Sequence, residues 1–139
     1  MTVEYITLTD YIAIAVEVTG LDLRTVLNVT NFALADSALH APQSGFGDTD
    51  HYDDFIDKAA ILLDRLTRNH PLLDGNKRAA WVSLRLFVEI NEWTWNPTPT
   101  IDDAETAVLA IASGEWTHQT TASWLRNYLR PAPENNNND

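Results

Sequence analysis

Residues 79–90 form an apolar segment that constrains the fold of this 139-residue chain more than any other. At helical spacing, its apolar side chains cover nearly the whole circumference of a helix. One face carries Ala79, Ala80, Val82, Leu86, Phe87 and Ile90, and Trp81, Leu84 and Val88 cover much of the rest. A helix that is apolar nearly all round lies inside a protein rather than on its surface. The segment therefore predicts a helix at the centre of a helical bundle.

Helical patterns also lie on both sides of this segment. Apolar residues recur every three or four positions over 56–68, namely Ile56, Ala59, Ala60, Leu63 and Leu66. Cap residues predict further helices over 7–18, ending at Gly20, and over 22–39, beginning at Asp22. Two more are expected over 101–112 and 117–129, after a short extended hook at 93–95. The expected fold class is all-α, a compact bundle of about six helices in one domain over residues 1–130.

Composition excludes several classes of protein. The chain has no cysteine, so disulfides and thiolate metal ligands are impossible, and a cytoplasmic location is expected. No apolar run approaches the length of a membrane span, and the first residues lack the pattern of a signal peptide. Residues 131–139 begin with Pro-Ala-Pro and end in an Asn run, which predicts a disordered C-terminal tail.

Charge is distributed unevenly along the chain. The net charge of −11 argues against nucleic acid as a direct partner, because an acidic surface repels a phosphate backbone. Six of the nine Lys and Arg residues nevertheless lie between positions 58 and 85, where only two acids occur. This local cationic segment predicts a pocket for one small polyanion.

Residues 70–78, His-Pro-Leu-Leu-Asp-Gly-Asn-Lys-Arg, connect the two expected central helices. His70 is the candidate catalytic base, because imidazole is the side chain that changes charge near neutral pH. Asp74 is the candidate metal ligand, since a carboxylate suits Mg²⁺, the usual companion of a nucleoside triphosphate. Taken singly, these residues are more typical of an ordinary turn between helices, but their combination with His70 and the Lys77–Arg78 pair favours a phosphate site.

The second half of the same segment is expected to bind phosphate. Gly75 allows positive φ and a close approach of the backbone to a ligand. Asn76 begins the next helix, where unpaired N–H groups and the helix dipole attract an anion. Lys77 and Arg78 supply positive charge for phosphate oxygens. Gly75, Asn76, Lys77 and Arg78 are therefore the candidate nucleotide-binding residues.

The segment resembles the signature loop of the Fic/Doc superfamily, His-x-Phe-x-Asp/Glu-Gly/Ala-Asn-x-Arg. Leu72 stands where the family usually has Phe. Lys77 and Trp81 replace a small residue and a second Arg that adenylylating Fic proteins typically carry, and both departures are similar to the Doc, or death-on-curing, branch. The resemblance covers roughly residues 5–130.

Membership of that branch implies a fold and an activity. It implies the toxin of a type II toxin–antitoxin pair, a kinase that inhibits translation by transferring phosphate from ATP or another nucleoside triphosphate, with Mg²⁺, to a threonine of elongation factor Tu. The alternative within the superfamily is a protein adenylyltransferase.

The resemblance also assigns a flap before the central helices. It implies that residues 43–47 line the pocket and align an extended stretch of the target protein by strand addition. These residues are Gln43, Ser44, Gly45, Phe46 and Gly47.

The family further suggests how such a toxin is restrained. Some Fic proteins inhibit themselves through a Ser/Thr-x-x-x-Glu-Gly/Asn motif. The one Glu here that precedes Gly or Asn is Glu134, and Arg130 stands where Ser or Thr is required. Restraint is therefore expected from a cognate antitoxin of the Phd type.

Two alternatives of other classes remain open. Arg65 and His70 satisfy the Arg-x4-His pattern of HEPN ribonucleases, which are also all-helical. That hypothesis leaves residues 74–78 unexplained. A catalytically inactive binding module on the same fold is the other alternative, against which His70, Asp74 and Asn76 argue.

Overall fold

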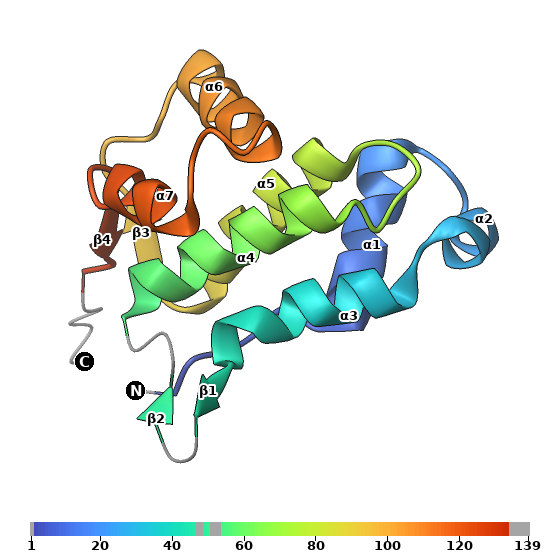
Figure 1. The fold of residues 1–139 in the computed structure, drawn as a ribbon, viewed down its shortest axis with the longest axis horizontal. Coiled ribbons are helices and arrows are strands. Elements are labelled where there is room, and N and C mark those ends of the chain that lie inside the picture. Colours follow the sequence, from blue (N-terminus) through green and yellow to red (C-terminus); the bar gives the residue numbers. More distant parts are fainter. Residues whose placement is uncertain (1, 47–48, 51–53, 134–139) are drawn as a thin grey trace, which may run out of the picture.

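The structure is a computed structural model that describes residues 2–46, 49–50 and 54–133, with residues 45–46 and 49–50 described by backbone only. Within these ranges it contains seven α-helices, one 3₁₀ helix and four short strands (Figure 1). In chain order the elements are α1 (Leu8–Thr19), α2 (Leu23–Val29), α3 (Phe32–His40), η1 (Ala41–Gln43), β1 (Gly45–Phe46), β2 (Thr49–Asp50), α4 (Phe55–Asn69), α5 (Asn76–Ile90), β3 (Trp93–Trp95), α6 (Ile101–Ala112), α7 (His118–Leu125) and β4 (Leu129–Pro131). The expected all-α fold is confirmed.

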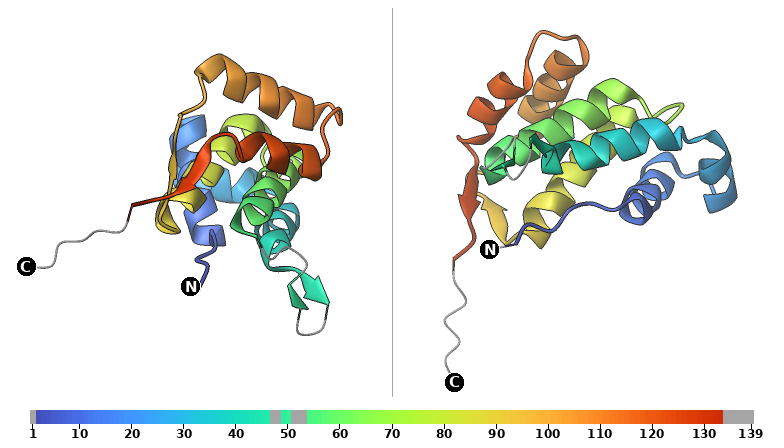
Figure 2. Two further views of the ribbon diagram at one scale, coloured as in Figure 1. Left: turned by 90° about the vertical axis from the view of Figure 1, so that its left-hand side faces the viewer. Right: turned by 60° about the horizontal axis from the view of Figure 1, so that its bottom comes forward.

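Helix α4 lies at the centre of the bundle, packed against α5, α3, α7 and α6 (Figures 1 and 2). The five apolar residues that predicted this helix are all buried. On α5, Ala79, Ala80, Leu84 and Phe87 have no exposed surface, while Ile90 reaches solvent. Helix α1 covers α5 from the other side. The two helices that flank the motif are thus fixed by burial, and the loop between them has rigid supports.

The helix expected over residues 22–39 is wrong, because the structure has two helices there. The Thr30 hydroxyl donates to the Val26 carbonyl oxygen (2.6 Å) at the end of α2. The Asn31 side chain then accepts from the Leu34 N–H (3.1 Å) and caps α3. Side chains of this kind compete with helical hydrogen bonds and so end one helix and begin another. The break frees the Asn31 N–H, which donates to the Pro71 carbonyl oxygen (2.8 Å).

The expected helix starts at residues 7 and 22 are confirmed by their caps. Thr7 and Asp10 form a reciprocal capping box at the start of α1. The Asp22 carboxylate accepts from the Thr25 N–H (2.8 Å), and Gly20 ends α1 with φ 72°. These caps turn the chain tightly between α1 and α2, which brings both helices beside the loop that follows α4.

The described part of the chain ends with a short antiparallel pair of strands. β4 pairs with β3 in the register Trp93 with Pro131 and Trp95 with Leu129. The Ala132 N–H continues the pairing by donating to the Glu92 carbonyl oxygen (2.8 Å). The hook expected at 93–95 is therefore a strand, and residues 131 and 132 are ordered parts of the fold. Residues 134–139 of the expected tail lie outside the described residues.

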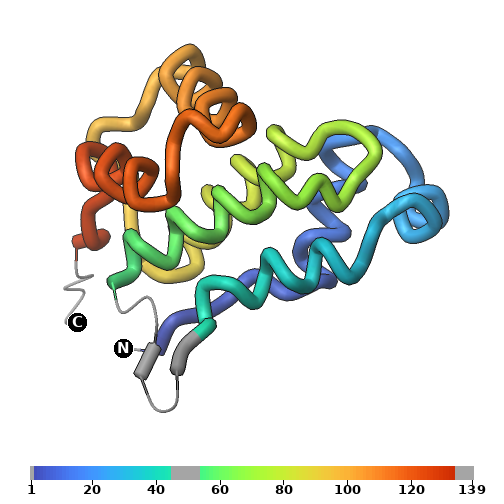
Figure 3. The backbone as a smooth tube through the Cα atoms, viewed as in Figure 1, coloured from blue at the N-terminus to red at the C-terminus, as the bar shows by residue number. Residues whose placement is uncertain are grey.

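The two ends of α4 carry different parts of the chain. η1 lies beside the start of α4, and the loop 70–75 follows its end (Figure 3). β1 and β2 pair next to η1, at the same end (Figure 1). Among the described residues, none of the helices has both the length and the hydropathy that a bilayer span requires.

Candidate active site

His70 follows α4 in a left-handed backbone conformation, with φ 50° and ψ 58°. This conformation turns the chain out of the helix, and the exposed imidazole lines a cavity of about 670 Å³. The volume falls within the range of small-molecule and cofactor sites, roughly 300–1,000 Å³. An exposed imidazole in such a cavity can accept the proton of a hydroxyl bound there.

The cavity has two unlike walls. One wall is the loop and helix start that the sequence predicted, with His70, Asp74 and residues 75–78, to which Leu72 and Leu73 add apolar surface. The other is mostly aliphatic and comes from α1, α2 and the turn between them. Its residues are Val18, Thr19, Leu21, Val26 and Val29. A charged wall facing an apolar wall suits a ligand with a phosphate end and a less polar body.

Gly75 is required by both its conformation and its surroundings. Its φ of 81° is strained for any other residue. A Cβ at this position would also lie 3.3 Å from Val18 Cγ1 and 3.5 Å from Thr19 Cγ2. Glycine therefore lets the start of α5 approach the end of α1, and both of these segments line the cavity.

The start of α5 has no side-chain cap, because its N-cap residue is Gly75. The N–H groups of the first turn consequently receive no acceptor from a capping side chain and can donate to an anion. Lys77 and Arg78 lie in this same turn, and both are exposed and line the cavity. Backbone donors and two cations thus lie together, as the sequence analysis expected of a phosphate site.

Asn76 uses its side chain within the loop. Its Oδ1 accepts from the Leu72 N–H (2.9 Å), and its Nδ2 donates to the Leu72 carbonyl oxygen (2.8 Å). The residue is only 8% exposed. The contribution of Asn76 to anion binding is therefore expected from its backbone N–H. Leu72 itself is buried, as an anchor in the place of the usual Phe should be.

Asp74 is the sole carboxylate among the described residues that line the cavity. No group of three or more His, Cys, Asp or Glu residues gathers into a metal site within the described part of the chain. One carboxylate beside a candidate phosphate site nonetheless fits Mg²⁺, which is commonly bound through one or two carboxylates, substrate phosphates and water. Asp74 fits that role better than it fits a metal cage made only of protein.

Trp81 does not line the cavity, although it lies close to the motif in sequence. Its ring packs against Trp95 and Trp124, with centroid distances of 5.5 and 6.2 Å. The position where adenylylating relatives carry a second Arg therefore belongs here to an aromatic cluster. The candidate phosphate site therefore consists of the first turn of α5, without a contribution from position 81.

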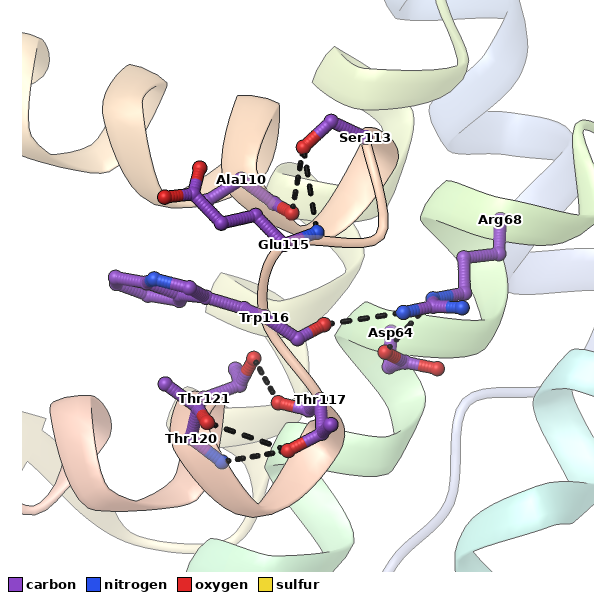
Figure 4. Close-up of polar contacts among 9 residues, drawn as sticks. All are labelled: Asp64, Arg68, Ala110, Ser113, Glu115, Trp116, Thr117, Thr120 and Thr121. Carbon is purple, nitrogen blue, oxygen red and sulfur yellow. Dashed lines mark hydrogen bonds and ion pairs between the residues drawn. The ribbon is translucent and has the colours of Figure 1, made fainter.

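Arg65 and His70 line different cavities. Arg65 belongs to a cavity on the other side of the α4 end, with Asp64, Arg68 and the start of α7. There Arg68 donates to the Trp116 carbonyl oxygen (3.0 Å) and pairs with Asp64 (3.1 Å), as Figure 4 shows. Burial raises the pKa of Asp64, and the positive charge of Arg68 opposes that shift. The pair that the ribonuclease hypothesis needs is not brought together.

The described part of the expected flap lies away from His70. Gln43 and Ser44 do not line the cavity. The Lys58 Nζ, which is buried, donates to the Pro42 carbonyl oxygen (2.9 Å) and so fixes the segment before the flap. Lys58 precedes His70 by twelve residues of helix, or about 18 Å along the axis. Gly47 lies outside the described residues, and Gly45 and Phe46 are described by their backbone only.

Sequence reasoning missed the aliphatic wall of the cavity. Val18, Val26 and Val29 fit an amphipathic helical pattern, which predicts core positions as readily as a ligand wall. The exposed Leu21 in the turn after Gly20 was the one available signal, since a large apolar side chain in a turn is unexpected.

Comparison with known proteins agrees with the geometry of the site. The Fic/DOC family matches residues 5–88, which include the whole loop and the aliphatic wall. The protein named Toxin Doc from Mycolicibacterium smegmatis (strain ATCC 700084 / mc(2)155) is 35% identical over 106 residues, 76% of this chain and 82% of that protein. These similarities support a toxin and a transferase as the class of function. The chain belongs to the Fic/DOC family.

Proposed function

We propose that the protein is the toxin of a type II toxin–antitoxin pair and that it phosphorylates a hydroxyl group on a translation factor. The substrates are ATP, or another nucleoside triphosphate, and a threonine of elongation factor Tu. The observation that carries the proposal is the juxtaposition of His70 with an uncapped, cationic helix start in one cavity. A base beside an anion site is what phosphoryl transfer to a hydroxyl requires.

The proposed reaction assigns one step to each group. The target hydroxyl loses its proton to the His70 imidazole as its oxygen bonds to the γ-phosphorus. The bond between the γ-phosphorus and the bridging oxygen breaks, and ADP leaves. The first turn of α5, with Lys77 and Arg78, stabilises the charge on the phosphate oxygens. Mg²⁺, held by Asp74 when bound, would neutralise further phosphate charge.

Phosphate transfer is favoured over AMP transfer by two positions. Lys77 lies in the cavity where adenylylating relatives have a small residue, so it reduces the space and adds charge beside the helix start. Trp81 packs in the aromatic cluster, so this position has no guanidinium group that could bind the terminal phosphates through two hydrogen bonds. Both features disfavour a nucleotide placed with its α-phosphate opposite His70. Adenylyl transfer is the second candidate.

The proposed partner in the cell is a cognate antitoxin of the Phd type. It is supported by the similarity to a protein named as a toxin and by the lack of a self-inhibitory motif in the sequence. In this proposal the antitoxin restrains an otherwise active enzyme.

Purified elongation factor Tu incubated with labelled ATP tests the proposal. Label on the γ-phosphate is expected to reach the factor, and label on the α-phosphate is not. The double change of Lys77→Gly with Trp81→Arg should raise the fraction of α-label transferred. Efficient α-label transfer by the unchanged protein would replace the kinase with the adenylyltransferase, and degraded RNA without any protein adduct would favour the ribonuclease.

The metal is tested through Asp74. Asp74→Ala should weaken ATP binding chiefly when Mg²⁺ is present, because the carboxylate acts through the ion. Calorimetry with Mg²⁺ and with EDTA measures this difference. Equal ATP affinity of the two proteins under both conditions would reduce Asp74 to a turn residue.

A further inference from the structure

The backbone conformation of His70 is costly for a residue with a side chain. His70 and Glu92 are the two non-glycine residues with positive φ in the described part of the chain, at 50° and 59°. Such conformations persist where the surrounding structure fixes them, and they are frequent at functional sites. The contacts of the residues next to His70 show what fixes it here.

The first turn of α3 contacts the residues on both sides of His70. The Asn69 Nδ2 donates to the Leu34 carbonyl oxygen (3.1 Å), and the Asn31 N–H donates to the Pro71 carbonyl oxygen (2.8 Å). The Asn31 side chain in turn caps the Leu34 N–H, so the two contact points belong to one rigid turn. His70 is thus held between two hydrogen bonds to the same element.

The second positive-φ residue has a similar arrangement. Asn91 precedes Glu92, and its Nδ2 donates to the Glu4 carbonyl oxygen (2.8 Å) in a distant segment. In both places an asparagine near the end of a helix ties the left-handed residue that follows it to another part of the fold. The repetition indicates that the asparagine amide helps to stabilise this helix ending.

We propose that Asn69 is a positioning residue, which acts with the start of α3 to hold His70 in the conformation that presents its imidazole to the cavity. This role rests on the proposed phosphotransferase function. Asn69 lines the cavity on the other side of α4, so it acts on the reaction through His70. Without its amide, the last turn of α4 can loosen, and the imidazole leaves the position needed for proton transfer.

The effect should be moderate, since the hydrogen bond from Asn69 to Leu34 is exposed and is one of two that hold His70. Loss of an ordinary hydrogen bond changes a conformational equilibrium by roughly two- to tenfold. Asn69→Ala should therefore lower kcat for phosphate transfer from ATP to purified elongation factor Tu by about this factor. KM for ATP should stay within about twofold, because the anion site on α5 is unchanged.

Hydrogen exchange supplies a readout that does not depend on activity. The Asn31 N–H is bonded to Pro71, so its exchange rate reports whether the loop is attached to α3. In Asn69→Ala this amide should exchange faster by a factor similar to the loss in kcat. The exchange rate of the Leu63 amide, inside α4, should be the same in the folded variant as in the natural protein.

Asn91→Ala is the matched control. It removes the same kind of bond from a more buried asparagine at the end of α5, together with two further bonds of that side chain, to the Glu4 N–H and the Phe87 carbonyl oxygen. It should therefore lower Tm at least as much as Asn69→Ala. It should leave kcat and the exchange of Asn31 unchanged. An equal loss of kcat in the two variants would make the effect of Asn69 a general loss of stability and overturn the proposal.

The remaining outcomes are also decisive. Unchanged exchange of Asn31 in Asn69→Ala, or faster exchange with unchanged kcat, overturns the positioning role. If the unchanged protein transfers no group from ATP, the proposed function has failed. The exchange of Asn31 and the ring nitrogen shifts of His70 then still show whether Asn69 positions the imidazole, and no change in either rejects it.

Discussion

The two ends of α4 show how one helix serves two purposes. At its start, the Asp54 side chain accepts a hydrogen bond from the Ile56 N–H (3.1 Å), which is a regular N-cap of the kind that Asp favours. At its end, His70 adopts a left-handed conformation next to an uncapped helix start. The start of α4 therefore stabilises the fold, whereas the end of α4 holds the candidate catalytic residue His70.

Charge follows the same division. Asp54 and Asp57 at the start of the helix are both paired with Arg126, at 2.6 and 3.2 Å. Lys77 and Arg78 beyond the end of the helix line the cavity, where a phosphate can neutralise them. Cations that lie together in a cavity favour an anionic ligand, whereas cations paired with carboxylates favour the folded state. This difference favours the end of α4, and not its start, as the candidate site.

The largest expected effect separates the two ends by activity. His70→Ala should lower the rate of phosphate transfer by about 10²–10⁴, the usual value of a general base. The side chain is exposed, so thermal unfolding followed by circular dichroism should show little change.

Arg65→Ala is the control for this experiment. Arg65 is exposed on the other side of α4, and the transferase does not need it, whereas the ribonuclease does. A folded His70→Ala protein that stays toxic would exclude the proposed mechanism. Loss of toxicity in Arg65→Ala together with RNA degradation would favour the nuclease.

The next effect concerns the approach of α5 to α1. Gly75→Ala should destabilise the protein by about 1–3 kcal/mol, because it combines positive φ with a close contact to Val18. It should also weaken ATP binding, since the start of α5 must move. Chemical unfolding and calorimetry measure the two losses.

Gly20→Ala is the matched variant for Gly75→Ala. Gly20 has a similar φ of 72°, but an added Cβ would meet nothing within 4 Å. Its loss should be about 1 kcal/mol and should come from the backbone alone. An equal loss in the free energy of unfolding for the two substitutions would mean that the close contact with α1 does not contribute to the effect of Gly75→Ala.

The sequence predicted those parts of the fold that depend on local pattern. The buried stripe of α4, the apolar α5 and the caps at Thr7 and Asp22 lie as expected, because spacing and cap residues act within a few positions. The loop 70–78 was also found, since its residues are adjacent in sequence and the chain brings them to one cavity.

The parts that could not be predicted depend on long-range contacts. The break at Thr30 and Asn31 is accompanied by a hydrogen bond to Pro71, forty residues further on. The aliphatic wall exists only because α2 turns back beside the loop after α4, and the pairing of β4 with β3 joins residues far apart in sequence.

A smaller effect should appear in the dependence of stability on pH. Burial raises the pKa of Asp64, so its protonated form is favoured in the folded state. The stability that this group contributes is therefore present at low pH and is lost as pH rises through the raised pKa. Asp64→Asn does not titrate, so the free energy of unfolding of the natural protein should fall relative to that of the variant above about pH 4.

Urea unfolding of both proteins at several values between about pH 4 and pH 7 measures this trend. If the free energy of unfolding of the natural protein instead rises with pH relative to that of Asp64→Asn, the attraction of Arg68 for the Asp64 carboxylate outweighs the cost of burial.

The smallest effect is expected at the start of α4. Arg126→Ala breaks two ion pairs, but the side chains are each about 40% exposed, and such pairs contribute about 0–1 kcal/mol. Asp54 keeps its cap on Ile56, so the helix should still begin at the same residue. The small loss should shrink further in high salt, where exposed charges are screened.

Phosphate transfer should be unchanged, because the His70 end of the helix is held by α3 and not by Arg126. A tenfold loss of kcat in Arg126→Ala, at unchanged Tm, would mean that the two ends of α4 are coupled and that the division between them is wrong.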